Sequence, residues 1–181
     1  PGISSFITHT LAEIDKFISE SRNAINIKNK NITEDRFGLL KVRENLISVN
    51  ERRDEIVLTL DSMEQLIKTL DEVGVNRESD LKRNVRLIDE WRNMEKLATM
   101  VEKDIAPYVK IEAEKSKDDI IKFEDELRQY KADIAKESFY IYKTGVSGAF
   151  KRLEYVKGQL SEYDEKVSNF DYFSRMFGLT D

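Results

Sequence analysis

The sequence predicts an all-α protein, an elongated antiparallel bundle of about four long amphipathic helices with heptad seams. Two features of the 181 residues predict this class: apolar residues recur at alternating spacings of three and four, and the chain has only seven glycines and two prolines. The first pattern is typical of helices that pack nearly parallel to one another. The second excludes an all-β sandwich or barrel, which would need a cluster of turn residues about every 8–12 positions.

The first two helices are expected over residues 3–27 and 33–73. The seam of the first consists of Ile7, Leu11, Ile14, Ile18 and Ile25. The second is interrupted only at Arg53, and its seam consists of Leu39, Val42, Leu46, Val49, Ile56, Leu60, Met63, Ile67 and Leu70. Asn31 and Glu34 have the spacing of a capping box. Gly74 stands where a C′ glycine would end the second helix.

The third and fourth helices are expected over residues 77–142 and 147–177. The third seam starts with Leu87, Trp91, Met94, Ala98, Val101, Ile105 and Tyr108, then shifts phase and resumes with Ile120, Phe123, Leu127, Tyr130, Ile134 and Ile141. Pro107 lies at the shift, and we expect a kink or break there because an interior proline removes a hydrogen bond and clashes with the preceding turn. The fourth seam is broken only at Ser174 and consists of Ala149, Leu153, Val156, Leu160, Tyr163, Val167, Phe170 and Phe177.

The charge pattern excludes several classes of partner. The chain carries 30 Lys and Arg against 35 Asp and Glu, a net charge of −5, with the two signs interspersed. A nucleic-acid-binding protein would be expected to show a basic stripe, and none is present. No apolar run approaches the roughly 18 residues of a membrane span. We therefore expect neither a nucleic-acid nor a membrane partner, and because the sequence begins at Pro1 we expect a fragment of a larger chain.

No pattern of residues indicates catalysis. A phosphate-binding loop needs closely spaced glycines before Lys-Ser or Lys-Thr, and the sequence has none. The chain has no cysteine, which excludes disulfides and cysteine-based metal or redox sites. His9 is the one histidine, and its neighbours are Thr8 and Thr10 rather than carboxylates. We therefore expect no enzyme activity, no cofactor and no metal in this region.

Aromatic residues are the candidates for protein contacts. Ten of the 17 aromatic residues fall between Phe139 and Phe177, and rings gathered at one end of a bundle suggest that this end docks on another surface. Phe170 and Phe177 lie on the seam and are expected in the core, whereas Tyr172 and Phe173 lie off it and are candidate partner contacts. Trp91 is either a core residue or a hot spot for a partner.

Several motifs, in order and correctly spaced together, resemble a dynein heavy chain over residues 85–181. They are Glu90-Trp91 with Leu97, Ile105-Ala106-Pro107, Glu114, Phe139-Tyr140-Ile141-Tyr142, Gly145, Ala149 with Leu153, Tyr163, and Met176-Phe177-Gly178-Leu179. The region they resemble is the end of the tail just before the linker, in a form associated with axonemal, particularly outer-arm, chains. Thr180-Asp181 stands where the family usually has a proline.

The resemblance implies a non-catalytic, force-transmitting segment of an ATP-driven, minus-end-directed microtubule motor. The ATPase ring and the microtubule-binding domain would lie C-terminal to Asp181. The implied partners are the rest of the same heavy chain on its linker side, other dynein chains or neighbouring heavy chains, and the microtubule only indirectly. The implied location is the axoneme of a cilium or flagellum, with the cytoplasm as the alternative. The competing interpretation is a free-standing spectrin-like scaffold for protein–protein interaction.

Overall fold

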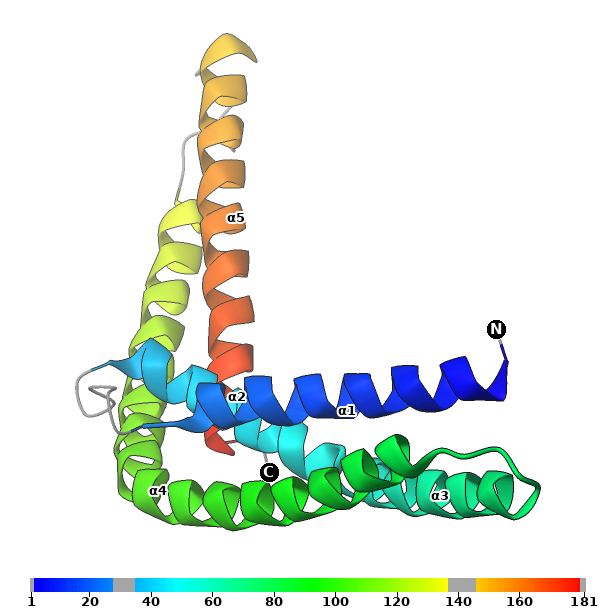
Figure 1. The fold of residues 1–181 in the computed structure, drawn as a ribbon. Helices are drawn as coiled ribbons and strands as arrows, with labels where there is room; N and C mark the ends of the chain where they lie inside the picture. Colours follow the sequence, from blue (N-terminus) through cyan, green and yellow to red (C-terminus); the bar gives the residue numbers. More distant parts are fainter. Residues whose placement is uncertain (1, 28–34, 137–145, 180–181) are drawn as a thin grey trace. The chain divides into compact units, whose positions relative to one another are not determined.

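The computed structural model describes residues 2–27, 35–136 and 146–179, and within them it contains five α-helices and no strand (Figure 1). The helices are α1 (Ile3–Ile25), α2 (Arg36–Glu51), α3 (Arg53–Glu72), α4 (Glu78–Ala135) and α5 (Val146–Phe177). The all-α prediction is therefore confirmed. The chain divides into two compact units, Pro1–Tyr108 and Val109–Asp181, which we call unit 1 and unit 2. Helix α4 contributes residues to both.

Unit 1 is a bundle of three helical segments, each antiparallel to the segment that precedes it in the chain. Contacts of α1 with Arg77, which precedes α4, and with the first turns of α4 pair residues whose numbers rise together: Ser4 with Arg77, Asp15 with Arg83, and Phe17 with Trp91. Contacts between α3 and α4 pair rising with falling numbers: Arg53 with Glu95, and Leu60 with Asn84. Helix α1 also packs against α2 and α3. Thus α1 and α4 run in the same direction, and the α2–α3 segment runs opposite to both.

The core of unit 1 consists of residues from the predicted seams. The buried seam residues are Ile7, Leu11, Ile14, Ile18, Ile25, Leu39, Val42, Leu46, Val49, Ile56, Leu60, Met63, Ile67, Leu87, Trp91, Met94, Ala98, Val101 and Ile105. Within each of the three segments every position follows the previous one by three, four or seven residues, so each segment presents one apolar face to the other two. Burial of a side chain of this size contributes about 1.5–3 kcal/mol relative to its exposure to water.

The second expected helix, 33–73, is divided into α2 and α3, so five helices are present where about four were expected. The break is at Arg52, whose φ of −89° and ψ of 0° depart from helical values. Arg53, where the predicted seam is interrupted, follows this break and is not part of the apolar core, because a guanidinium is costly to bury without a partner. Arg53 instead forms an ion pair with Glu95 at 3.0 Å, and the Arg52 guanidinium lies 4.3 Å from the centre of the Phe17 ring.

Two glycines end helices in the left-handed conformation. Gly74 has φ +85°, with its amide donating to the Asp71 carbonyl and the Val75 amide donating to Leu70. This pair of hydrogen bonds is the Schellman motif, and the predicted C′ glycine is confirmed. Gly178 has φ +67° and ends α5 in the same way. The Asn31–Glu34 capping box lies outside the described residues.

Helix α4 continues through Pro107, which lies inside its assigned range. The kink expected there stays a prediction. The third helix was expected to reach residue 142, but α4 ends at Ala135, and residues 137–145 lie outside the described part of the chain.

Unit 2 is an antiparallel pair formed by the part of α4 that follows Tyr108 and by α5. The pairs that hold it together run in opposite senses along the chain: Phe123 with Phe170, Glu126 with Lys166, and Tyr130 with Tyr163. Two helices form only one interface between them. In unit 2 this interface buries Val156 and Phe177 of α5, whereas Leu160 stays 48% exposed.

Candidate protein-interaction site

Aromatic rings and one lysine hold the two helices of unit 2 together. The buried Phe123 ring on α4 lies 5.7 Å from the Tyr163 ring and 5.2 Å from the Phe170 ring on α5. Tyr130 meets Tyr163 edge to face at 5.0 Å. Such pairs contribute about 0.5–1.5 kcal/mol beyond the area they bury. Several aromatic residues of this part of the sequence therefore pack against one another inside unit 2.

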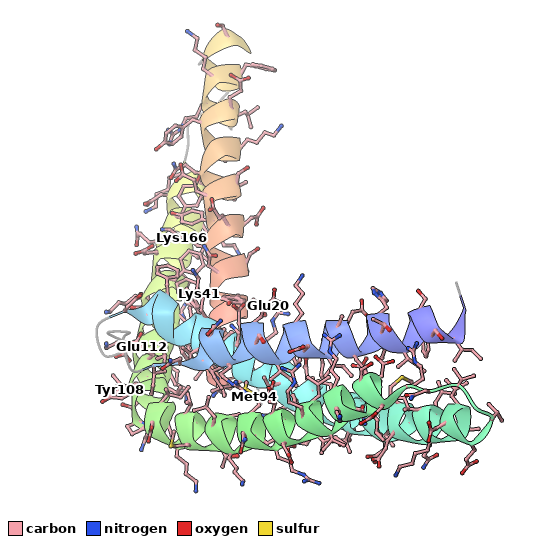
Figure 2. The ribbon with its side chains drawn as sticks, viewed as in Figure 1. Glu20, Lys41, Met94, Tyr108, Glu112 and Lys166 are labelled. Carbon is pink, nitrogen blue, oxygen red and sulfur yellow. The ribbon has the colours of Figure 1, made fainter. Side chains whose placement is uncertain are left out.

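Lys166 lies on the side of α5 that faces α4 (Figure 2). Its ammonium nitrogen is 5.7 Å from the centre of the Phe123 ring, 5.5 Å from that of Tyr163, and 3.7 Å from a carboxylate oxygen of Glu126. A cation over two ring faces is attracted by their negative quadrupoles. Lys166 therefore joins the aromatic cluster to the polar edge of the helix pair.

The predicted seam of α5 is divided into a covered half and an exposed half. Val156 and Phe177 are buried, and Ala149, Tyr163 and Phe170 are half-buried. These five positions repeat every seven residues. Leu153, Leu160 and Val167 form the other heptad position of the seam, and each of the three side chains is 48–50% exposed. Phe150, also exposed, lies one turn before Leu153 on the same side.

We call Phe150, Leu153, Leu160 and Val167 the α5 stripe. Its members lie along one face of the helix, with Leu153, Leu160 and Val167 about two turns apart. Isolated exposed apolar residues are normal on proteins, but exposed apolar residues that repeat along one face of a helix are a candidate interaction surface. The stripe was missed as a surface in the sequence because seam position alone does not say which half of a seam is covered.

Tyr172 and Phe173, the two predicted partner contacts, are both half-buried. Their rings are 5.9 Å apart, and Phe173 lies 6.4 Å from the buried Phe177. The three rings therefore form one cluster at the C-terminal end of α5. A role in binding a partner stays a prediction.

Trp91, the third predicted contact, lies in the core of unit 1. Its side chain is buried, and its ring centre is 6.4 Å from that of Phe17. Its Nε1 atom has no hydrogen-bond partner among the described residues. In unit 1 it therefore packs as a core residue, and a contact role stays a prediction.

A carboxylate between two arginines joins α1 to α4 in unit 1. Asp15 accepts hydrogen bonds from Arg83 at 3.0 Å and from Arg86 at 2.8 Å. Burial alone would raise the pKa of Asp15, but the hydrogen bonds and positive charges of the two arginines outweigh it, and the pKa lies below its usual value of 3.8. The carboxylate is therefore ionised over the physiological pH range, and its hydrogen bonds to the two arginines hold α1 against α4.

The residues that carry the sequence resemblance are spread over both units. Pro107 lies within α4, Leu153 belongs to the α5 stripe, and Phe177 is buried. Gly178 and Leu179 form the Schellman motif after α5. Phe139 and Gly145 lie outside the described residues. The structure thus gives the final Phe-Gly-Leu a local role, which is to end the helix.

A cluster of metal-binding side chains is not found in the part of the chain that the structure describes. No group of three or more His, Asp or Glu residues there could hold a metal ion. His9 pairs with Glu13 at 3.4 Å on an exposed face of α1. Of the helices described, none is long and apolar enough to cross a membrane.

The chain is similar to several dynein chains. It is 27% identical over 143 residues, 77% of the chain, to the dynein alpha chain of the flagellar outer arm from Chlamydomonas reinhardtii. It is 28% identical over 136 residues, 73% of the chain, to human dynein axonemal heavy chain 9. To the ciliary dynein beta chain of Tripneustes gratilla it is 23% identical over 176 residues, 94% of the chain. No family model matches the sequence.

These similarities establish weak-to-moderate homology, at 23–28% identity, between most of this chain and axonemal dynein heavy chains. The chain spans only 3–4% of the length of these relatives. The alignment with the Tripneustes gratilla chain covers 94% of this chain, whereas the sequence motifs begin at residue 85. The similarity in that alignment therefore extends well before residue 85.

Proposed function

We propose that this chain is a non-catalytic, force-transmitting segment of an axonemal dynein heavy chain, located in the tail next to the linker. The observation that carries the proposal is the homology to three such chains over 73–94% of the sequence. Its location is then the axoneme of a cilium or flagellum. Its partners are the linker side of the same heavy chain, other dynein chains or neighbouring heavy chains, and it meets the microtubule only indirectly.

The packing of unit 1 supports a mechanical role. A segment that transmits force must resist deformation, and close-packed interiors have low compressibility. Unit 1 has a continuous apolar core along three helical segments. Polar contacts at several levels, among them Asp15 with Arg83 and Arg53 with Glu95, resist sliding of the helices along one another. ATP hydrolysis would be the work of other parts of the heavy chain.

Immunoblotting tests the proposal directly. Because about 140–180 residues of this chain correspond to 3–4% of the relatives, a heavy chain would be roughly 25-fold longer than 181 residues. An antibody raised against this chain should detect a polypeptide of that size in isolated axonemes of the source cells. Antibody pre-absorbed with the chain is the control. A single band near 21.2 kDa would contradict the proposal.

A variant of the intact motor tests the mechanical role. Leu87 is fully buried in unit 1, and Leu58 is 66% exposed on α3. Leu87→Asp should lower the speed at which the motor moves microtubules while leaving its ATPase activity intact, because a buried carboxylate disrupts the core. Leu58→Asp is the matched control and should move microtubules normally. Unchanged motility of Leu87→Asp would contradict force transmission through unit 1.

The topology of unit 1 favours one alternative. Three antiparallel segments in up-down-up order are what a free-standing spectrin-like scaffold would have, and such a protein would bind partners along the bundle. This alternative predicts the 21.2 kDa polypeptide in the immunoblot. The same experiment therefore separates the two functions.

A further inference from the structure

The α5 stripe is a row of large apolar side chains that stays exposed among the described residues of unit 2. Leu153, Leu160 and Val167 are spaced by seven residues, so they lie in a nearly straight row of about 21 Å at 1.5 Å per residue. Residues that repeat every seven positions occupy one heptad position, and a second helix can lie along such a line of side chains. The stripe is therefore shaped to receive a helix.

The charges along α5 indicate which helix. Between residues 146 and 160 the net charge is +2, from Lys151, Arg152 and Lys157 against Glu154. Between residues 161 and 177 it is −2, from Lys166 and Arg175 against Glu162, Asp164, Glu165 and Asp171. A second α5 helix in antiparallel orientation would bring the positive half of each copy beside the negative half of the other. A parallel pair would bring like charges together.

Two exposed charges flank the stripe in the positions that an antiparallel pair requires. Lys157 and Asp164 lie one heptad apart on the same edge of the stripe, on either side of Leu160. Neither side chain takes part in an ion pair within the described residues. About a two-fold axis at Leu160, Lys157 of each copy faces Asp164 of the other. The same face of one chain is thus complementary to itself, as a two-fold interface demands.

We propose that unit 2 binds a second copy of this chain, with α5 packed antiparallel against α5 around a two-fold axis at Leu160. Leu160 meets Leu160 of the second copy, Leu153 meets Val167, and two Lys157–Asp164 ion pairs close the edge. A single helical stripe is smaller than a standard protein interface, so we expect dissociation constants in the micromolar range. This association does not depend on the proposed function, and its test uses this chain alone.

A single cysteine tests the position of the axis. The chain has no cysteine of its own, so Leu160→Cys introduces one thiol per molecule. On a two-fold axis the two thiols lie opposite each other, and mild oxidation should give a covalent dimer in high yield. Leu58→Cys, on the exposed side of α3, is the matched control and should remain monomeric. Equal cross-linking of the two variants, or none at Leu160, would overturn the proposal.

Charge exchange tests the orientation. In sedimentation equilibrium at 10–200 µM protein, Lys157→Glu and Asp164→Lys should each weaken the dimer about tenfold, because each places like charges together twice. The double variant should restore it, since the two charges are merely exchanged across the axis. Circular dichroism checks that all variants stay helical. A wild-type chain that stays monomeric throughout, or a double variant weaker than both single variants, would overturn the proposal and leave the stripe to a different helix.

Discussion

Neighbouring leucines on α3 give the sharpest test of how unit 1 packs. Leu60 is 2% exposed and Leu58 is 66% exposed, although the two lie on the same helix. Leu60→Ala replaces a buried isobutyl side chain by a methyl group and should lower the free energy of unfolding by about 2–5 kcal/mol, which includes the cost of the cavity left behind. The hydrogen bond from Asn84 to the Leu60 carbonyl involves the backbone and survives the substitution. Leu58→Ala should change stability by less than about 0.5 kcal/mol.

Urea unfolding followed by tryptophan fluorescence measures these costs. Trp91 is the one tryptophan of the chain and lies in the core of unit 1, so its emission reports on this unit alone. With an m-value of about 1.5 kcal/mol/M, Leu60→Ala should lower the midpoint by roughly 1–3 M and Leu58→Ala hardly at all. Similar losses for both variants, or a larger loss for Leu58→Ala, would refute the assigned face of α3.

Three further predictions concern other parts of the structure. Asp15→Asn should lower the free energy of unfolding of unit 1 by about 0.5–2 kcal/mol at neutral pH. The pKa of Asp15 in the folded protein lies below 3.8, so this difference in stability should persist above pH 5. In acid denaturation curves it should shrink as the pH falls through the folded pKa. Gly74→Ala should lower the free energy of unfolding by about 1–2 kcal/mol, because the φ of Gly74 is +85°. Gly158 lies in the interior of α5 with open space around it, so Gly158→Ala should stabilise that helix by about 0.5–1 kcal/mol in thermal unfolding. Phe123→Ala should cost unit 2 about 3–5 kcal/mol in helical circular dichroism melts, and Phe150→Ala, a matched exposed ring, under about 0.5 kcal/mol.

Heptad periodicity predicted the core of unit 1 well. Apolar spacing alone identified buried positions in α1, α2, α3 and the first part of α4, because each of these helices has neighbours on both sides of its seam. The end of α3 could also be predicted, since a left-handed residue after a helix favours glycine and Gly74 follows the last seam residue.

Features that depend on partners could not be predicted from spacing. The seam of α5 looks as regular as the others, yet Val156 is buried and Leu160 is half exposed. A heptad pattern defines an apolar face, but the number of helices packed against that face is a property of the assembly. Phe173 lies off the seam and is nevertheless half-buried, with the rings of Tyr172 and Phe177 5.9 and 6.4 Å away.

Polar contacts help to fix the register of the helices in unit 1. A shift of one segment by seven residues would again place apolar residues opposite apolar residues, so the core alone distinguishes such registers weakly. Asn84 occupies a seam position of α4, is fully buried, and donates a hydrogen bond of 3.1 Å to the Leu60 carbonyl. The Arg53–Glu95 ion pair fixes the same two segments near their other end. Any such shift breaks both contacts and leaves a buried amide unpaired, which costs about 1–3 kcal/mol. These polar pairs therefore add to the apolar seams in fixing the register of the three segments.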